Sequence, residues 1–224
     1  MAALARVVCV CGLAAEARIA RAAGFAAVVG AGNRERTALL AAKAVAGAEC
    51  VVSFGIAGGL APHLQPGALL LASEVIGVAR RWTGRPDLAG KLARQIGAAR
   101  GPVLGAHDIL ASRHDKARAW HATQALAVDL ESVAVAEAAA SAGIPFLVLR
   151  AIADPAGRDL PPAALLKLSE TGMPVPTAVL GSLLRQPRQL PALLALALET
   201  RRAFAALVPA AHALRRLLDG DLLD

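Results

Sequence analysis

Short apolar runs alternate with Ala-rich stretches of helical pattern through the first two thirds of the chain. Apolar runs of about four to eight residues bounded by turn residues are typical of buried strands, and longer periodic stretches are typical of helices. Strands are predicted at residues 5–11, 26–30, 50–55, 68–75, 102–106, 126–129 and 145–152. Helices are predicted at residues 14–23, 33–46, 87–99, 112–123 and 131–142.

This repeated order of strand and helix predicts an α/β fold. We expect three α/β/α layers around a central twisted sheet that is mixed but mostly parallel. The stretch from residue 126 to residue 154 holds two apolar runs separated by a helical segment. That order predicts a βαβ unit in which the two strands run parallel.

The last third of the chain follows a different pattern. Leucines continue at helical spacing from Pro161, and the segment Met173–Pro176, which contains two prolines, should kink or interrupt that helix. A second helix is expected from about Leu190 to Leu218. Because no repeat or low-complexity linker separates the parts, we expect one domain over residues 1–224, with a helical C-terminal extension at about 161–218.

Composition narrows the setting in which the protein works. The chain has 224 residues, 56% of them hydrophobic, which is enough for one full core. No apolar run reaches the roughly 18 residues of a spanning helix, and no signal-peptide pattern opens the chain. We therefore expect a cytoplasmic protein. Cys9, Cys11 and Cys50 lie in apolar runs, so we expect buried free thiols rather than metal ligands.

The net charge of +7 raises the question of nucleic-acid binding. Against it, aromatic residues make up 3% of the chain, there is no Tyr, and the basic residues are scattered. A solvated Arg-rich surface is the simplest interpretation, followed by attraction to an anionic membrane surface. We expect no nucleic-acid partner and keep peripheral membrane contact as an alternative.

Two acidic residues follow apolar runs in the second half of the chain. Glu131 comes just after the predicted strand 126–129, and Asp154 comes just after the predicted strand 145–152. In parallel sheets ligands gather at the carboxyl ends of the strands. Two carboxylates delivered to one edge of a sheet indicate acid–base chemistry on a polar substrate.

Three further features accompany this pair. The segment Ser53–Leu60 is predicted to be a Gly-rich turn after a strand, where backbone N–H groups can approach a ligand closely. Glu16 follows the first strand near a helix start. Gly30–Asn33 is a second glycine-rich strand exit, but it lacks the complete dinucleotide-binding fingerprint.

Together these motifs are more specific than any one of them. Their order is strand–GLAAE, strand–GAGN, strand–FGIAGGL, strand–VDLES and strand–RAIAD. Over residues 4–155 this order resembles the nucleoside phosphorylase/nucleosidase superfamily, and its catalytic pattern looks most like the methylthioadenosine/S-adenosylhomocysteine nucleosidases. The basic, Leu/Ala-rich tail with LKLSETGMPVP is similar to a narrower branch, the hopanoid-biosynthesis-associated phosphorylases, proposed adenosylhopane nucleosidases.

The resemblance implies cleavage of an adenine N-ribosidic bond. Asp154 would protonate N7 of the leaving purine, and general acid catalysis of this kind contributes about 10²–10⁴-fold. Glu131 would stay ionised and accept hydrogen bonds from the ribose hydroxyls. Glu16 would activate water, which favours hydrolysis over phosphorolysis. Phosphorolysis would need cations at a phosphate site, and Arg18, Arg34 and Arg36 are candidates.

The resemblance also implies the substrate contacts. These come from the Gly-rich segment, from the VDLES motif and from the loop at residues 110–115: Gly55, Ile56, Ala57, Gly58, Asp129, Leu130 and His114. His114 stands where relatives stack an aromatic ring on the base, although a surface histidine is an equal alternative. Ala153 replaces the family's Ser before Asp154, so either a water or a main-chain group replaces the lost hydroxyl, or the pKa of the acid is tuned differently.

We therefore predict an enzyme without cofactor or metal that takes a small-molecule nucleoside. The product of the narrower branch would be ribosylhopane from adenosylhopane, so the substrate can be lipid-linked. The alternatives are phosphorolysis to phosphoribosylhopane, a methylthioadenosine/S-adenosylhomocysteine nucleosidase, and a non-catalytic nucleoside- or lipid-binding module. Relatives usually pair across the active-site face, which implies a homodimer.

Overall fold

The computed structural model describes residues 7–221, so the first two residues of the predicted strand 5–11 lie outside the described range. The strands are β1 (Val7–Cys11), β2 (Ala26–Val29), β3 (Cys50–Gly59), β4 (Leu69–Ile76), β5 (Arg81–Trp82), β6 (Ala99–Gly105), β7 (Ala127–Asp129) and β8 (Phe146–Asp154). The helices are α1 (Ala14–Ala22), α2 (Arg34–Val45), α3 (Pro86–Ile96), α4 (Arg113–Thr123), α5 (Ser132–Ala142), α6 (Pro176–Arg185) and α7 (Leu190–Asp221), with short 3₁₀ turns η1 (Pro162–Leu165) and η2 (Pro187–Gln189).

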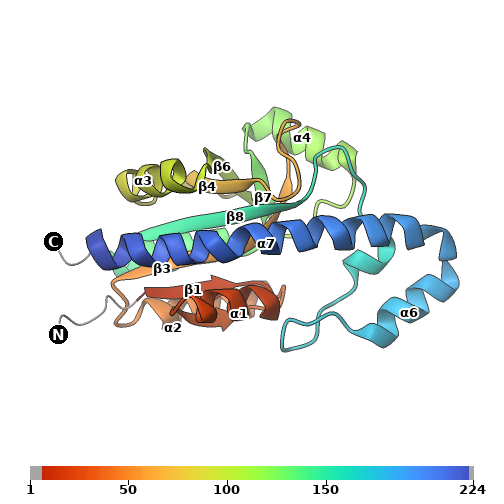
Figure 1. The fold of residues 1–224 in the computed structure, drawn as a ribbon, viewed down its shortest axis with the longest axis horizontal. Helices are drawn as coiled ribbons and strands as arrows, with labels where there is room; N and C mark the ends of the chain where they lie inside the picture. Colours follow the sequence, from red (N-terminus) through yellow and green to blue (C-terminus); the bar gives the residue numbers. More distant parts are fainter. Residues whose placement is uncertain (1–6, 222–224) are drawn as a thin grey trace.

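The strands form one mixed sheet between two helical layers, which confirms the predicted fold class. The strand order is β2-β1-β3-β7-β6-β4-β5, and β8 pairs with both β3 and β4. Apolar side chains of α1, α3 and α7 pack on one face of β1, β3 and β8, and those of α2 and α5 pack on the opposite face. In Figure 1 the long helix α7 crosses in front of the sheet along β8.

The predicted parallel βαβ unit is wrong, because β7 and β8 are not parallel neighbours. Both pair with β3 instead, β8 in parallel over most of its length and β7 antiparallel at the far end. At that end Gly58 pairs with Val128 of β7 and with Asp154 of β8. The two acidic motifs therefore meet through a shared central strand rather than at the common edge of a parallel pair.

The Gly-rich segment is also not the turn that was predicted. Strand β3 continues through it to Gly59, with a register irregularity between Ala57 and Gly58. Pairing on both sides holds this stretch extended, and glycine is needed for close packing. A Cβ on Gly59 would lie 3.1 Å from the Ile152 side chain and 3.2 Å from the carbonyl oxygen of Asp154.

Other differences are local. The strand predicted at 102–106 begins earlier, at Ala99, and the two-residue strand β5 was not predicted because so short a run carries no periodicity. The interruption predicted at Met173–Pro176 is present, but the helix before it is reduced to the turn η1. Cys9, Cys11 and Cys50 are buried free thiols, as predicted.

Helix α7 joins the C-terminal part to the main core. Leu207, Leu214 and Leu218 are fully buried in the same cluster as the strands β1, β3 and β8. On this shared core we propose that the chain forms a single domain. None of the helices within residues 7–221 combines the length and the apolar character needed to cross a membrane.

Leu214→Ala should lower the free energy of unfolding by about 2–5 kcal/mol, because it leaves a cavity between α7 and the sheet. Leu198, which lies in the same helix and is 60% exposed, provides the matched control. Leu198→Ala should change stability by less than about 0.5 kcal/mol. Urea denaturation of both variants measures the difference, and equal losses would mean that α7 does not carry core packing.

Candidate active site

A buried arginine organises the acidic residues. The Arg150 side chain is fully buried in the middle of β8. Its Nε donates to Asp129 Oδ2 at 2.7 Å, and its Nη2 donates to Ser53 Oγ at 2.6 Å and to Glu131 Oε2 at 3.3 Å. Arg150 therefore forms buried ion pairs with Asp129 and Glu131.

Asp129 uses both of its carboxylate oxygens on protein donors. Oδ2 accepts from Arg150 and from the Ser132 hydroxyl, and Oδ1 accepts from the backbone N–H of Ser132 at 2.9 Å and of Glu131 at 3.2 Å. These bonds hold the start of α5 and so place Glu131. We therefore assign Asp129 a positioning role in place of the substrate contact that was predicted.

Glu131 is buried but can still accept a hydrogen bond. Its Oε2 accepts from Arg150 Nη2, and the backbone N–H of Leu130 also bonds the carboxylate, so its oxygens can take at least one further donor. The pKa of Glu131 is raised to about 7. Burial is the main cause, the negative charges of Asp129 and Glu16 add to the rise, and Arg150 opposes it. Gly12 lies beneath this carboxylate, and a Cβ there would be 2.5 Å from Glu131 Oε1.

Glu16 lies in a nest of backbone donors. Its Oε2 accepts from the N–H groups of Gly12 and Leu13, each at 2.8 Å, and its Oε1 accepts from the N–H of Ile56 at 2.8 Å. Burial raises the pKa of Glu16, while Arg150 and these N–H groups oppose the rise. A Cβ on Gly55 would lie 2.3 Å from Glu16 Oε1, so the close approach requires glycine there.

The third predicted acid, Asp154, ends β8 beside a lysine that sequence reasoning did not identify. Lys116 Nζ forms an ion pair with Asp154 Oδ2, and the lysine side chain is 1% exposed. Burial raises the pKa of Asp154, and Lys116 lowers it. The only available signal was a single lysine in the fifth position of the helix predicted at residues 112–123, and lysines are most often on the surface.

The predicted substrate-binding residues fall in two groups. Gly55, Ile56, Ala57 and Gly58 lie along the end of β3, where Gly55 faces Glu16 and Gly58 faces Asp154. His114, by contrast, is exposed on α4. The three acids and the end of β3 therefore come together, and His114 lies at their margin on the helix that carries Lys116.

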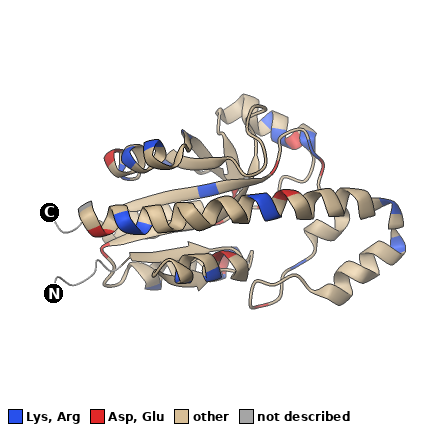
Figure 2. Ribbon diagram, viewed as in Figure 1, with Lys and Arg blue, Asp and Glu red and all other residues tan. Residues whose placement is uncertain are grey.

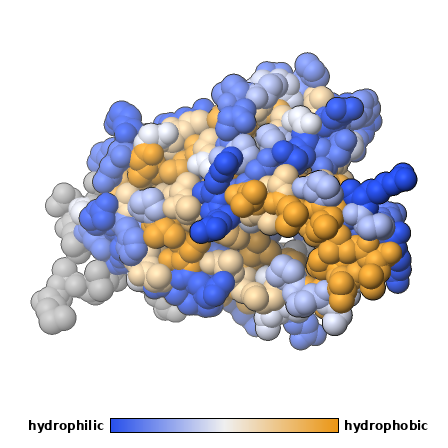
Figure 3. All heavy atoms as spheres, turned by 45° about the vertical axis from the view of Figure 1, so that its right-hand side comes forward, coloured by the Kyte–Doolittle hydropathy of each residue, from blue (hydrophilic) through white to orange (hydrophobic). Residues whose placement is uncertain are grey.

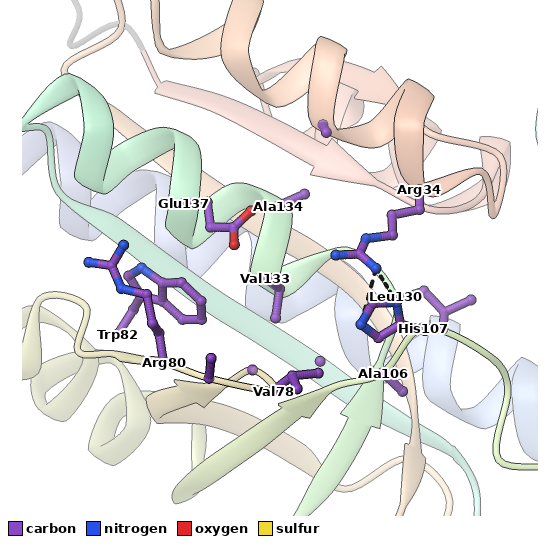
Figure 4. A pocket seen from close by; sticks show the side chains of 14 residues that line it. Arg34, Val78, Arg80, Trp82, Ala106, His107, Leu130, Val133, Ala134 and Glu137 are labelled. Carbon is purple, nitrogen blue, oxygen red and sulfur yellow. Dashed lines mark hydrogen bonds between the residues drawn. The ribbon is translucent and has the colours of Figure 1, made fainter.

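Leu130 points elsewhere, into a separate cavity of about 200 Å³. Arg34, Arg80, His107, Trp82 and Glu137 also line it, and Arg34 hydrogen-bonds His107 in Figure 4. Neither Glu16 nor Asp154 lines this cavity, and no lining residue comes after Glu137 in the sequence. The chemistry of the acids therefore lies outside this cavity, and the helices after Pro161 do not line it.

The buried charges at the site are unequal. Four acids (Glu16, Asp129, Glu131, Asp154) stand against two cations, Arg150 and Lys116, so full ionisation leaves an excess of two negative charges. The exposed Lys and Arg residues, in contrast, are spread over several helices in Figure 2. The net positive charge thus belongs to the surface, and the site itself favours a cationic or electron-poor species.

Comparison with known proteins assigns the chain to a family. The sequence profile of the Phosphorylase superfamily matches residues 4–173. No curated protein sequence matches the chain. The fold resembles several solved structures that share few identical residues with it, and at this level of identity the likeness concerns the fold.

Three of these structures cover nearly the whole chain. A 5'-methylthioadenosine/S-adenosylhomocysteine nucleosidase from Colwellia psychrerythraea, in complex with adenine, is 15% identical, has a TM-score of 0.71 and covers 96% of each chain. The Neisseria meningitidis nucleosidase with methylthio-immucillin-A is 18% identical, with a TM-score of 0.68 and coverage of 96% of this chain and 99% of its own. The Helicobacter pylori futalosine hydrolase is 13% identical, with a TM-score of 0.65 and coverage of 98% of both.

Arg150→Met should lower the free energy of unfolding by about 3–5 kcal/mol, because Asp129 and Glu131 are left buried without a cation. The loss should be larger at pH 8 than at pH 6. Without Arg150 the folded pKa of Glu131 lies even further above its unfolded value, and that penalty grows as pH rises. Arg81→Met, which removes a surface pair with Glu74, should cost less than about 1 kcal/mol. Urea titrations at both pH values test this, and a pH-independent loss would contradict it.

Proposed function

The chain belongs to the Phosphorylase superfamily and is an enzyme of the nucleosidase or nucleoside phosphorylase type; on that premise, we propose that it hydrolyses the N-ribosidic bond of a 5'-substituted adenosine and releases adenine. The observation that carries this proposal is the meeting of Glu16, Glu131 and Asp154 at the end of β3. Each of the three carboxylates has a separate set of partners, which is what three different roles in one cleavage require.

The bonding of Glu16 supports water rather than phosphate as the nucleophile. The N–H groups of Gly12, Leu13 and Ile56 form a nest that could bind an anion, but the Glu16 carboxylate already occupies them. A phosphate dianion would have to enter beside a buried negative charge. A carboxylate whose pKa is raised by burial is also a stronger base toward water than an exposed one.

The excess of negative charge supports bond cleavage through an electron-poor sugar. As the C1′–N9 bond breaks, the ribose develops oxocarbenium character, which buried carboxylates stabilise more strongly than water does. Glu131 suits this role because Arg150 bonds only its Oε2, and a carboxylate has lone pairs left to accept a hydrogen bond from a ribose hydroxyl. Asp154 suits the other end of the bond, because its Oδ1 is free of hydrogen bonds to the described residues and can face the purine.

We further propose a lipid-linked substrate such as adenosylhopane, because the C-terminal segment carries an apolar surface beside the site. The N–H of Ala14 donates to the carbonyl oxygen of Gly172 at 3.2 Å, so the loop before α6 lies against the strand exit that holds Glu16. A group attached at the ribose 5′ carbon could leave along this loop towards α6 and α7.

The apolar surface consists of the exposed leucines of α6 and of the first half of α7. Leu184 is 76% exposed and Leu194 is 57% exposed, and Arg185 and Arg188 are exposed at the turn between the helices. Figure 3 shows hydrophobic atoms gathered at this end of the molecule, with hydrophilic groups projecting beside them. Apolar groups flanked by arginines suit an anionic lipid surface. A homodimer formed through this surface is the competing proposal.

Glu16→Gln should reduce adenine release from methylthioadenosine by at least about 100-fold, because the base for water is lost. Asp154→Asn should reduce it to a similar extent while the substrate still binds. Glu35→Gln, at an exposed acid of α2, should leave the rate unchanged. Adenine is measured with and without phosphate. 5-Methylthioribose 1-phosphate as product, or a rate that depends on phosphate, would replace hydrolysis by phosphorolysis.

The double variant Leu184→Glu/Leu194→Glu should release adenine more slowly from adenosylhopane in anionic vesicles, by roughly 10-fold, because charged residues weaken insertion of an apolar surface. Its activity on methylthioadenosine should not change. Leu39→Glu, at a leucine that is 66% exposed on α2, is the matched control. Equal loss on both substrates, with a shift from dimer to monomer in size measurements, would instead assign the surface to a second copy of the chain.

A further inference from the structure

Lys116 is the buried lysine on α4. Its ammonium group has three protons to donate, and three oxygens accept them. These are Asp154 Oδ2, the carbonyl oxygen of Pro155 at 3.1 Å and the carbonyl oxygen of Arg158 at 3.0 Å. The lysine is thus held at the end of β8 in one orientation, directed at the acid that ends the strand.

Such a residue is costly for folding. Taking an ammonium and a carboxylate out of water costs several kcal/mol per ion in effect, and apolar residues of similar volume are often as stable or more stable in their place. The rest of α4 does not need the pair, because Ser112 caps the helix and Asp159 accepts from the N–H of Arg113. The cost of burying Lys116 therefore calls for a role at the site itself.

We propose that Lys116 is a positioning residue that holds the proton which Asp154 delivers to N7 of the leaving purine. This inference rests on the proposed cleavage and explains how an acid paired with a cation still donates. In the resting enzyme the proton is on the lysine and Asp154 is a carboxylate. The proton passes from Lys116 Nζ to the Asp154 carboxylate as the purine approaches. It then passes from the carboxyl group to N7 as the C1′–N9 bond breaks.

The step balances in atoms and electrons. The C1′–N9 bond breaks with its electron pair on the purine, and N7 takes the proton from the Lys116–Asp154 pair. Water adds its oxygen to C1′ and gives a proton to Glu16. Afterwards Glu16 has gained one proton and the pair has lost one, so exchange with solvent restores the starting state. The overall reaction is nucleoside plus water to purine plus ribose.

Few other charged groups face the pair. Arg158, in the loop after β8, lowers the pKa of Asp154 and is itself bonded to Glu199 of α7 at 2.7 Å. On α4, Asp115 bonds Arg118 and Ser112, and His114 is exposed. Without Lys116, Asp154 would become a single buried carboxyl that must take its proton directly from solvent. Its acid form would then disappear as pH rises.

The test is the pH dependence of the variant Lys116→Met. The single-turnover rate of adenine release from methylthioadenosine is measured from pH 6 to pH 9 for the native protein and the variant. The native rate should fall less with rising pH, since the proposed pair supplies the proton from within the site. The variant rate should fall about tenfold per pH unit once Asp154 ionises, so the ratio of the two rates should rise by at least about 10-fold over the range.

Two further variants keep the outcome decisive. Lys116→Arg preserves the buried positive charge, and an arginine does not release its proton in proteins, so the same rising ratio is expected if Lys116→Met fails to fold. Thr123→Ala removes a hydrogen bond to the carbonyl oxygen of Ala119 at the other end of α4 and should leave the shape of the pH profile unchanged. If the ratio of native to variant rate stays constant with pH for the Lys116 variants, the inference is overturned and the proposed cleavage stands. If the native protein releases no adenine, both are overturned.

Discussion

The buried guanidinium of Arg150 is the interaction on which the rest of the site depends. Carboxylates repel one another and are costly to remove from water, so Asp129 and Glu131 can be buried together only around a cation. Arg150 supplies it from the middle of β8, with additional bonds to Ser53 of β3. The same cation acts on Glu16 through space and limits the rise of its pKa. One side chain thus bonds Asp129 and Glu131 and opposes the rise in pKa that burial causes at Glu16 and Glu131.

Gly12, directly after β1, and the glycines of β3 leave room for these acids. Gly12 lies under Glu131 and Gly55 lies under Glu16, and in both cases a Cβ would overlap a carboxylate oxygen. At the other end of the site, Gly58 is paired on both sides and approaches Asp154. The carboxylates therefore rest directly on the backbone of the central strands, which provides N–H donors at short range and excludes side chains that would move them.

The hydrophobic pattern was sufficient to predict most of the strands and helices. In an α/β fold each buried strand is a short apolar run and each helix is a longer periodic stretch, so the two are distinct in the sequence. The motifs that contain Glu16, Glu131 and Asp154 singled out three acids, and the fold brings these acids to the end of β3. The pattern could not indicate the direction of β7 relative to β8, since a helix between two strands leaves room for either arrangement once a third strand lies between them. It also placed a turn where β3 continues, since glycines are as common in turns as at close strand contacts.

The sequence by itself determined the fold class and named three candidate acids, because apolar runs and the motifs at their ends are made of residues next to one another in the chain. Only the tertiary structure decided what surrounds each acid. Lys116 and Asp154 are 38 positions apart and meet because α4 packs over the end of β8. Ile56 donates to Glu16 from 40 positions away. Such contacts depend on the packing of whole elements, so no local pattern of hydrophobic and polar residues can reveal them.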